Sequence, residues 1–299
     1  MYKPKGTIIT PPEPTTELKS GIATLIGRSN AGKSTLLNTL VGTKIAAVTD
    51  KPQTTRHNIH GILNHARGQV VFVDTPGVFK QTRTILSGQL VKTVHEAMQG
   101  IDVAVYVCDP GKAIGAEERA IMSLLRSSKA PKIMVINKSD LPTREKEFLT
   151  DYQALAPEFD AVFELSALKN RHIQPLVERV LDLLPVGVPL YPPDQLTNVD
   201  KNFWVAELIR EKVFLALRKE VPYTTKVEIT SIEEKPDLYV INAIIFTYDA
   251  RYKKMIIGTG GRAIKEIGIA ARKELEQALN KKVFLELNVE TDKHWIDRL

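Results

Sequence analysis

Two glycines stand five residues apart, ahead of a lysine and a hydroxyl residue, in the stretch GRSNAGKS at residues 27–34. The spacing fits G-x-x-x-x-G-K-[ST], in which glycine lets the backbone turn its N–H groups inward around phosphate oxygens. Lys33 is placed to reach the terminal phosphates and the Ser34 hydroxyl to bind Mg²⁺. The flanking residues predict a strand before the loop and a helix after it, and a helix N-terminus favours anions. The stretch therefore predicts a loop that binds a nucleoside triphosphate.

A second stretch, DTPG at residues 74–77, follows an apolar run 40 residues after Ser34. The Asp74 carboxylate suits Mg²⁺ held through water, and the Gly77 N–H suits the γ-phosphate. Four residues of this kind are weak evidence alone. Their position after the glycine loop makes them a predicted second part of the same site.

The choice of base depends on NKSD at residues 137–140 and SAL at residues 166–168. An aspartate at position 140 accepts hydrogen bonds from N1–H and the exocyclic N–H₂ of guanine. Adenine has neither donor there, so Asp140 would be left buried and unpaired, and such a site rejects the wrong base. A backbone N–H of SAL can bind the guanine carbonyl. The four motifs in this order predict GTP.

The residues predicted to bind the nucleotide come from these motifs. They are Gly27, Ser29, Asn30, Ala31, Gly32, Lys33, Ser34, Thr35, Asp74, Gly77, Asn137, Lys138, Asp140, Ser166, Ala167 and Leu168.

The elements that must position these residues alternate between strands and helices. Apolar runs predict buried strands, the last of them short and over 161–168, and predicted helices cover 33–42, 86–99, 117–128 and 173–184. This alternation predicts an α/β domain with a mostly parallel sheet and helices on both faces. The four prolines of PVGVPLYPPDQ, residues 185–195, interrupt it. Beyond them the order α-β-β-α-α-β predicts a smaller α+β domain.

Composition narrows the class of protein. Cys108 is the only cysteine, so an intrachain disulfide is excluded. The first residues show no secretory signal, and no apolar run is long enough for a membrane-spanning helix, so we expect a cytoplasmic location. Net charge is +6, and residues 251–282 hold nine basic residues against three acidic ones. Clustering of this kind is typical of a polyanion partner.

Three stretches, GRSNAGKSTLLNTLVG, KPQTTRHNIHGI and FVDTPGV, resemble the Era family of small bacterial GTPases, which carry a C-terminal RNA-binding domain of the KH type. The resemblance covers roughly residues 20–295. It implies a flexible N-terminal segment (1–17), a P-loop GTPase domain (18–185), a linker (186–199) and a KH type II domain (200–299).

The resemblance also implies partners. The RNA would be the 3′ end of small-subunit ribosomal RNA within the 30S particle, and the process would be ribosome assembly. We expect a monomer that binds no DNA. Peripheral contact with the inner face of the cell membrane has been linked with the family, although no amphipathic helix of this chain is reserved for it.

Hydrolysis involves residues 49–58 (TDKPQTTRHN), expected to close over the γ-phosphate. By resemblance Thr55 binds Mg²⁺ together with Ser34 and Asp74, and Thr54 is the alternative. Lys33, Thr55 and Gly77 are predicted to act in hydrolysis. Val78 follows DTPG where other small GTPases carry a glutamine that orients water, so we expect slow hydrolysis without a partner or activator. Asn30 resembles the asparagine with which related GTPases hold K⁺; a loop-stabilising role is the alternative.

The RNA site is predicted around G-x-x-G at residues 258–261. In KH domains this loop clamps the backbone of about four nucleotides. The predicted RNA-binding residues are Lys254, Ile257, Gly258, Thr259, Gly260, Gly261, Arg262, Ile264 and Lys265. Two positions depart from the family pattern: Thr259 replaces the usual lysine, and Glu286 stands where a basic residue is common. A different function stays open, in which the chain is a constitutive RNA-binding scaffold whose guanine nucleotide is structural.

Overall fold

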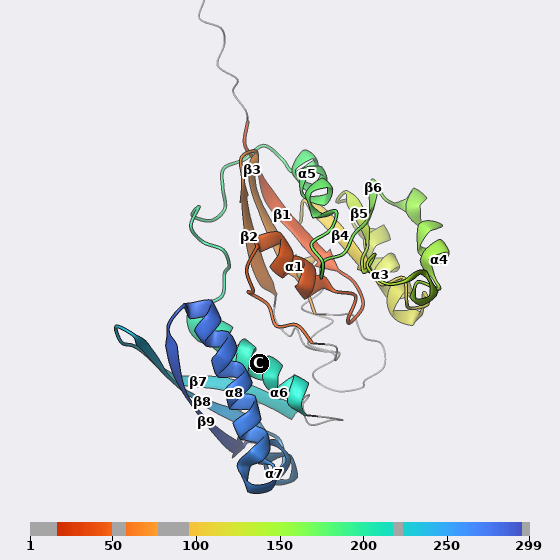
Figure 1. Ribbon diagram of the computed structural model, residues 1–299. Coiled ribbons are helices and arrows are strands. Elements are labelled where there is room, and N and C mark those ends of the chain that lie inside the picture. The colour runs from red at the N-terminus through yellow and green to blue at the C-terminus, as the bar shows by residue number, and fades with distance from the viewer. Residues whose placement is uncertain (1–16, 50–57, 77–95, 218–223, 295–299) are drawn as a thin grey trace, which may run out of the picture.

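The computed structural model describes residues 17–49, 58–76, 96–217 and 224–294, arranged as two domains (Figure 1). Several predictions fall outside these ranges: the roles of Thr54, Thr55, Gly77 and Val78, the N-terminal segment up to residue 16, and most of the helix predicted over 86–99. Within the described ranges, no helix is both long and apolar enough to cross a membrane.

The first domain is built on a sheet that has six strands among the described residues, in the order β2-β3-β1-β4-β5-β6. The strands are β1 (Lys19–Ile26), β2 (Ile59–His65), β3 (Gly68–Asp74), β4 (Val103–Cys108), β5 (Lys132–Ile136) and β6 (Ala161–Glu164). β2 runs antiparallel to β3, and the other neighbours are parallel. Every residue of β3 and β4 is buried, as expected for strands covered on both faces. The predicted mostly parallel sheet is confirmed.

Helices cover both faces of this sheet. α1 (Lys33–Val41) and α5 (Ile173–Leu183) pack on one face, and α3 (Ala116–Ser127) and α4 (Leu149–Gln153) pack on the other. α1 ends because Gly42 adopts a left-handed conformation, with φ 77°, and its N–H donates to the carbonyl of Asn38. Such a glycine is a common helix C-terminus.

One strand prediction is too long. The strand expected over 161–168 ends at Glu164. Beyond it the chain turns, because Ser166 pairs with Arg171 and the Ala167 N–H donates to the Asn137 side chain. The residues of SAL therefore leave the sheet and enter the predicted base site.

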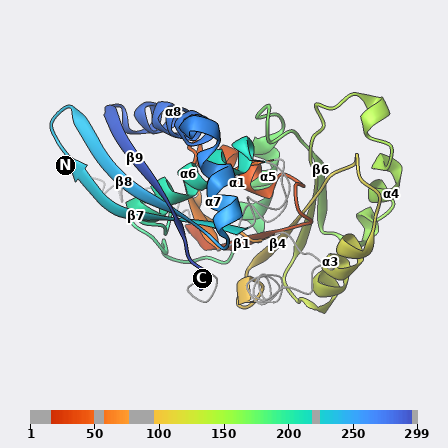
Figure 2. The ribbon, with the colours of Figure 1, turned by 90° about the horizontal axis from the view of Figure 1, so that it is seen from below.

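The second domain has the predicted order α-β-β-α-α-β. Its elements are α6 (Lys201–Ala216), β7 (Thr225–Glu234), β8 (Leu238–Thr247), α7 (Ala250–Ile257), α8 (Arg262–Leu279) and β9 (Lys282–Thr291). β8 lies in the middle, antiparallel to β7 and parallel to β9. α6 and α8 cover one face of this sheet (Figures 1 and 2). Residues of β8 alternate strictly between half-buried and buried, which is typical of a sheet covered on one face.

The proline-rich segment between the domains packs along the edge of the first sheet. The side chain of Gln69, on β3, accepts from the N–H groups of Leu190 and Tyr191 at 2.8 and 2.9 Å and donates to the Tyr191 carbonyl at 2.9 Å. The Ile62 N–H on β2 donates to the Leu196 carbonyl at 2.9 Å. The segment is thus held at several points of its length.

Candidate functional site

The glycine loop joins β1 to α1 at the carboxyl edge of the sheet. Gly32 has φ 98°, and a Cβ built on it would lie 2.2 Å from Nδ2 of Asn137. A Cβ on Gly27 would lie 2.2 Å from the carbonyl oxygen of Val107. Both positions therefore require glycine, because a side chain would collide with the neighbouring strands or their loops.

Lys33 reaches back across this loop. Its Nζ donates to the carbonyl oxygens of Gly27 and Arg28, at 3.0 and 3.1 Å. The side chain is buried, and burial lowers the pKa of Lys33 despite the opposing attraction of Asp74. A buried cation held by carbonyl oxygens is well placed to exchange these contacts for phosphate oxygens.

Ser34 and Asp74 meet although they are 40 residues apart in sequence. β1 and β3 are parallel neighbours, so Asp74 at the end of β3 comes beside the start of α1. The Ser34 Oγ donates to Oδ2 of Asp74 at 2.5 Å, and Asp74 is fully buried. Hydroxyl and carboxylate oxygens are the hard ligands that Mg²⁺ prefers. This donor set fits the predicted metal.

The remaining loop residues lie around this centre. Asn30 is exposed in a left-handed conformation, with φ 61°, and its Oδ1 accepts from the Ser29 hydroxyl at 3.4 Å. Ala31 is buried, and Thr35 lies on the first turn of α1.

Asn137 joins three of the four predicted motifs. It follows β5, is 2% exposed, and its Nδ2 donates to the Ala31 carbonyl of the glycine loop at 2.9 Å. Its Oδ1 accepts from the Ala167 N–H at 3.0 Å. One buried amide thus holds the phosphate loop against the SAL turn.

Asp140 lies beside the same turn. Its Oδ1 accepts from the buried Ser166 hydroxyl at 2.5 Å. Ser166 Oγ also accepts from the Lys169 N–H at 3.1 Å, which closes the turn. The turn therefore lies next to the Asp140 carboxylate, where the predicted recognition of guanine requires it. Leu168 is 71% exposed on the turn.

The structure adds two acidic residues that the motifs missed, Asp109 and Glu118. Lys138 has φ 60°, and its Nζ pairs with Oδ2 of buried Asp109 at 2.6 Å. Arg28 pairs with buried Glu118 on α3 at 3.3 Å. Asp109 directly follows the buried strand β4. Ligands bind at the carboxyl edge of a parallel sheet, so this position could have marked Asp109 as a residue of the site. Nothing in the spacing of Glu118 indicated its contact.

The predicted RNA loop lies between α7 and α8. Gly258, Gly260 and Gly261 all have positive φ, from 59° to 75°. A Cβ on Gly258 would lie 2.7 Å from Cβ of Ala263, whereas Gly260 and Gly261 have open space around them. The loop is tight where it meets α8 and exposed at Thr259 and Gly260.

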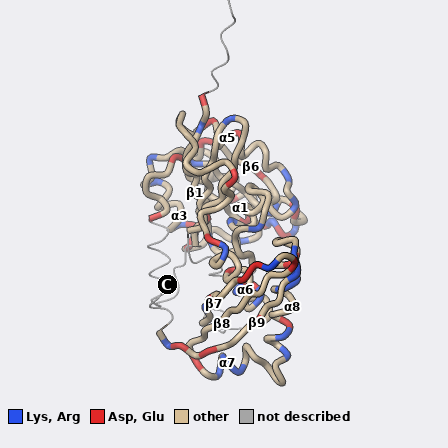
Figure 3. Tube along the Cα trace, turned by 90° about the vertical axis from the view of Figure 1, so that its left-hand side faces the viewer, with Lys and Arg blue, Asp and Glu red and all other residues tan. Residues whose placement is uncertain are grey.

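The cations predicted for RNA contact surround this loop. Lys254, Arg262 and Lys265 are exposed, and Figure 3 shows basic positions along α8. Ile257 and Ile264 are half-buried and pack against the core of the domain. The structure brings all nine predicted RNA residues to α7, the loop and the start of α8.

Comparison with known proteins agrees with this arrangement. Residues 22–138 match the family model described as 50S ribosome-binding GTPase, and residues 220–296 match the KH domain model. The chain is 40% identical over 282 residues to GTPase Era of Geotalea daltonii, covering 93% of this chain and 94% of that protein. It is 42% identical over 281 residues to GTPase Era of Geobacter metallireducens, with coverage of 93% and 94%.

Solved structures are similar over nearly the whole chain. A variant of Era from Aquifex aeolicus bound to GDP.AlF4- has a TM-score of 0.86 at 33% identity, covering 94% of this chain and 96% of that one. Era in complex with MgGDPNP and nucleotides 1506–1542 of 16S ribosomal RNA has the same TM-score, identity and coverage, 0.86, 33%, 94% and 96%. With its GTPase and KH domains in this order, the chain belongs to the Era family of GTPases.

Proposed function

We propose that this GTPase is a GTP-controlled protein that binds the 3′ end of small-subunit ribosomal RNA during assembly of the 30S particle. The observation that carries the proposal is the coexistence of two sites in one chain. Asn137 ties the phosphate loop to the turn beside Asp140, and exposed cations surround a G-x-x-G loop in the second domain.

In the first site, Lys33 and the N–H groups of the glycine loop hold the phosphates, and Ser34 and Asp74 hold Mg²⁺. The metal supplies positive charge that stabilises the terminal phosphates as the bond to the leaving oxygen breaks. Asp140 and the SAL turn select guanine. We assign Thr55 to the metal and Gly77 to the γ-phosphate, and we place a K⁺ site at Asn30.

In the second site, backbone N–H groups of residues 258–261 bind phosphates, and Lys254, Arg262 and Lys265 add charge. Ile257 and Ile264 present apolar surface to the bases. Support comes from the similar Era structure that holds nucleotides 1506–1542 of 16S ribosomal RNA. Thr259 contributes no charge, so RNA affinity depends more on the remaining cations.

We extend the proposal to the whole molecule. The domains divide at 18–185 and 200–299, with the segment 186–199 between them. The protein acts as a monomer in the cytoplasm and has no DNA partner, and its contact with the inner face of the membrane is peripheral.

The test is a fluorescence titration of the full chain with single-stranded RNA of the small-subunit 3′-end sequence and with a scrambled RNA of equal length. Each is measured with GDP and with a non-hydrolysable GTP analogue. We expect tighter binding of the 3′-end RNA and a difference between the nucleotides. Equal affinity for both RNAs would contradict the RNA assignment. Equal RNA affinity with GDP and with the GTP analogue would support the alternative function, a constitutive RNA-binding scaffold.

A further inference from the structure

Charged side chains from both domains meet where α6 and α8 face the first domain. Lys44 lies in the loop of residues 43–49, after α1; Glu211 and Lys212 lie on α6, and Glu274 lies on α8. Nζ of Lys44 and Nζ of Lys212 each lie 2.8 Å from Oε1 of Glu211. Both lysines also pair with Glu274. The four groups, here called the interdomain ring, carry no net charge.

Three of the four members of the interdomain ring are largely shielded from water. The side chains of Glu211 and Lys212 are 3% and 11% exposed, and that of Glu274 is 24% exposed. Burial disfavours charge on Lys212 and Glu274, but their hydrogen bonds outweigh it, so the pKa of Lys212 is raised and the pKa of Glu274 is lowered. Removing one member leaves a buried charge uncompensated, which is strongly destabilising locally.

The 43–49 loop is fixed to α6 through its backbone as well. Oε2 of Glu211 accepts from the Val48 N–H at 2.8 Å. The indole N–H of Trp204 donates to the Lys44 carbonyl at 2.9 Å. The second domain thus holds the loop at both ends.

The same loop is fixed to the GTPase domain by Asn38 of α1. Its Oδ1 accepts from the N–H groups of Ile45 and Ala46, both at 2.9 Å. Residues 45–47 are buried. The loop therefore connects α6 with the helix that starts with Lys33 and Ser34.

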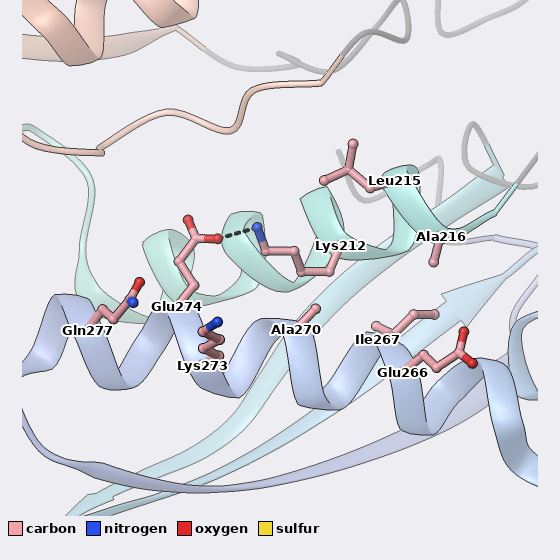
Figure 4. Close-up of a pocket in the computed structure, with 9 residues that line it drawn as sticks. All are labelled: Lys212, Leu215, Ala216, Glu266, Ile267, Ala270, Lys273, Glu274 and Gln277. Atoms are coloured by element: carbon pink, nitrogen blue, oxygen red, sulfur yellow. Dashed lines mark ion pairs between the residues drawn. The ribbon is translucent and has the colours of Figure 1, made fainter.

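α8 connects the interdomain ring with the predicted RNA loop. Arg262 opens the helix and Glu274 lies 12 residues later, about 18 Å at the rise of an α-helix. Between α6 and α8 lies a groove of about 480 Å³, lined by Leu215, Ala270 and Gln277 among others. Figure 4 shows the Lys212–Glu274 ion pair crossing it. The two helices also pack through the hydrophobic core of the domain, so the ion pair adds a charged contact to an apolar one.

We propose that Glu211 is a positioning residue for GTP hydrolysis, supplied by the second domain: it holds the backbone at Val48 in the 43–49 loop, which Asn38 joins to α1, the helix that begins with Lys33 and Ser34. Glu274 links this contact to the start of α8. RNA bound at the G-x-x-G loop therefore changes GTP turnover through Glu274, and this second step rests on the proposed RNA function.

The first experiment compares steady-state GTP hydrolysis by the full chain and its variants. Glu211→Ala should lower kcat about tenfold, which corresponds to about 1.4 kcal/mol, with the affinity for GDP unchanged. Glu211→Gln keeps an acceptor for the Val48 N–H but loses the charge that balances Lys44 and Lys212, so its kcat should fall less than that of Glu211→Ala. Glu234→Gln is the matched control, because it breaks the 2.6 Å ion pair with Lys281 elsewhere in the same domain.

A folded Glu211→Ala protein with kcat within twofold of the parent, or a loss equal to that of Glu234→Gln, would overturn the positioning role. If Glu211→Ala does not fold, Lys44→Ala removes the most exposed member of the ring, 36% exposed, and should also lower kcat.

The second experiment adds the 3′-end RNA. The parent protein should change its kcat on adding RNA, and Glu274→Ala should lose that response while binding RNA with unchanged affinity. A response retained in Glu274→Ala overturns the route through α8. Absence of RNA binding by the parent contradicts the proposed function, whereas the effect of Glu211→Ala without RNA still decides the positioning role.

Discussion

At the scale of single residues, Asn137 contributes more to the structure than base recognition requires. Its amide joins Ala31 and Ala167, which belong to separate loops. It also occupies the space that a side chain at Gly32 would need. The shape of the nucleotide site therefore depends on this one buried group.

Replacing Asn137 with alanine should destabilise the protein as well as weaken GTP binding. The Ala31 carbonyl and the Ala167 N–H would stay buried without partners, at a cost of roughly 2–4 kcal/mol. Urea denaturation followed by circular dichroism measures this loss. Gln153→Ala is the control, since it removes one exposed hydrogen bond to Glu164 and should cost less than about 0.5 kcal/mol. Equal losses for both variants would contradict the bridging role.

Asp140→Asn should exchange guanine selectivity for xanthine selectivity. The amide replaces an acceptor oxygen with a donor, so the N1–H and N–H₂ of guanine lose a partner, and affinity for GTP should fall about a hundredfold. Competition of GTP and XTP against a fluorescent nucleotide measures the exchange. Asp151→Asn, at an exposed position on α4, should change neither affinity. Equal affinity of the unmodified protein for ATP and GTP would refute the base assignment.

At the scale of elements, the G-x-x-G loop offers a clean separation of charge from shape. Gly261 has open space around it and φ 75°, a conformation that aspartate and asparagine tolerate better than other side chains. Gly261→Asp and Gly261→Asn should therefore both fold, whereas a side chain at Gly258 would collide with Ala263.

Gly261→Asp should abolish RNA binding because it adds negative charge where a phosphate must lie. Gly261→Asn has nearly the same shape without the charge and should bind RNA more weakly than the parent but measurably. Filter binding over a range of salt concentrations checks this. On the same assay Arg262→Ala and Lys265→Ala should each reduce the salt slope by about 0.7. Unchanged binding by Gly261→Asp would place the RNA elsewhere.

The proline-rich segment between the domains is tied to the first sheet because the Gln69 side chain bonds to its backbone. Gln69 is 2% exposed and bonds both N–H groups of Leu190 and Tyr191. Gln69→Leu should therefore speed amide exchange in the peptide containing those residues by about tenfold or more, because the free energy of local opening is lower. Hydrogen-exchange mass spectrometry gives the rates. Gln174→Leu, on the exposed face of α5, should leave them unchanged; slow exchange in Gln69→Leu would mean that other contacts suffice.

At the scale of the whole molecule, we propose that the two candidate binding sites are connected through α8 and the interdomain ring. Coupling between sites is reciprocal, so a preference of RNA for the GTP state over the GDP state requires RNA to tighten GTP relative to GDP by the same factor. We expect a factor of about 5–150, corresponding to 1–3 kcal/mol. Titrating a fluorescent GTP analogue with and without saturating RNA measures it. The same titration with a fluorescent GDP analogue gives the factor for GDP, and equal effects of RNA on the two nucleotides would contradict the coupling.

The sequence predicted the fold and most of the site because the signals were local. GRSNAGKS requires glycine at two positions, apolar runs require burial, and Gly42 ends a helix, so α1, β3 and β4 follow from neighbouring residues. The strand over 161–168 was overextended, since its last residues are turned away by a bond to Asn137, a residue distant in sequence.

By itself, the sequence determined which chemistry this protein can perform: four ordered motifs for guanine nucleotide and a G-x-x-G loop among cations. Tertiary structure decided how these parts are joined. Asn137 meets Ala31 across 106 residues, Lys44 meets Glu274 across 230, and Gln69 meets Tyr191 across 122. No local pattern encodes such pairs, because each buried polar group takes whichever partner the packed sheets and helices bring within hydrogen-bond distance.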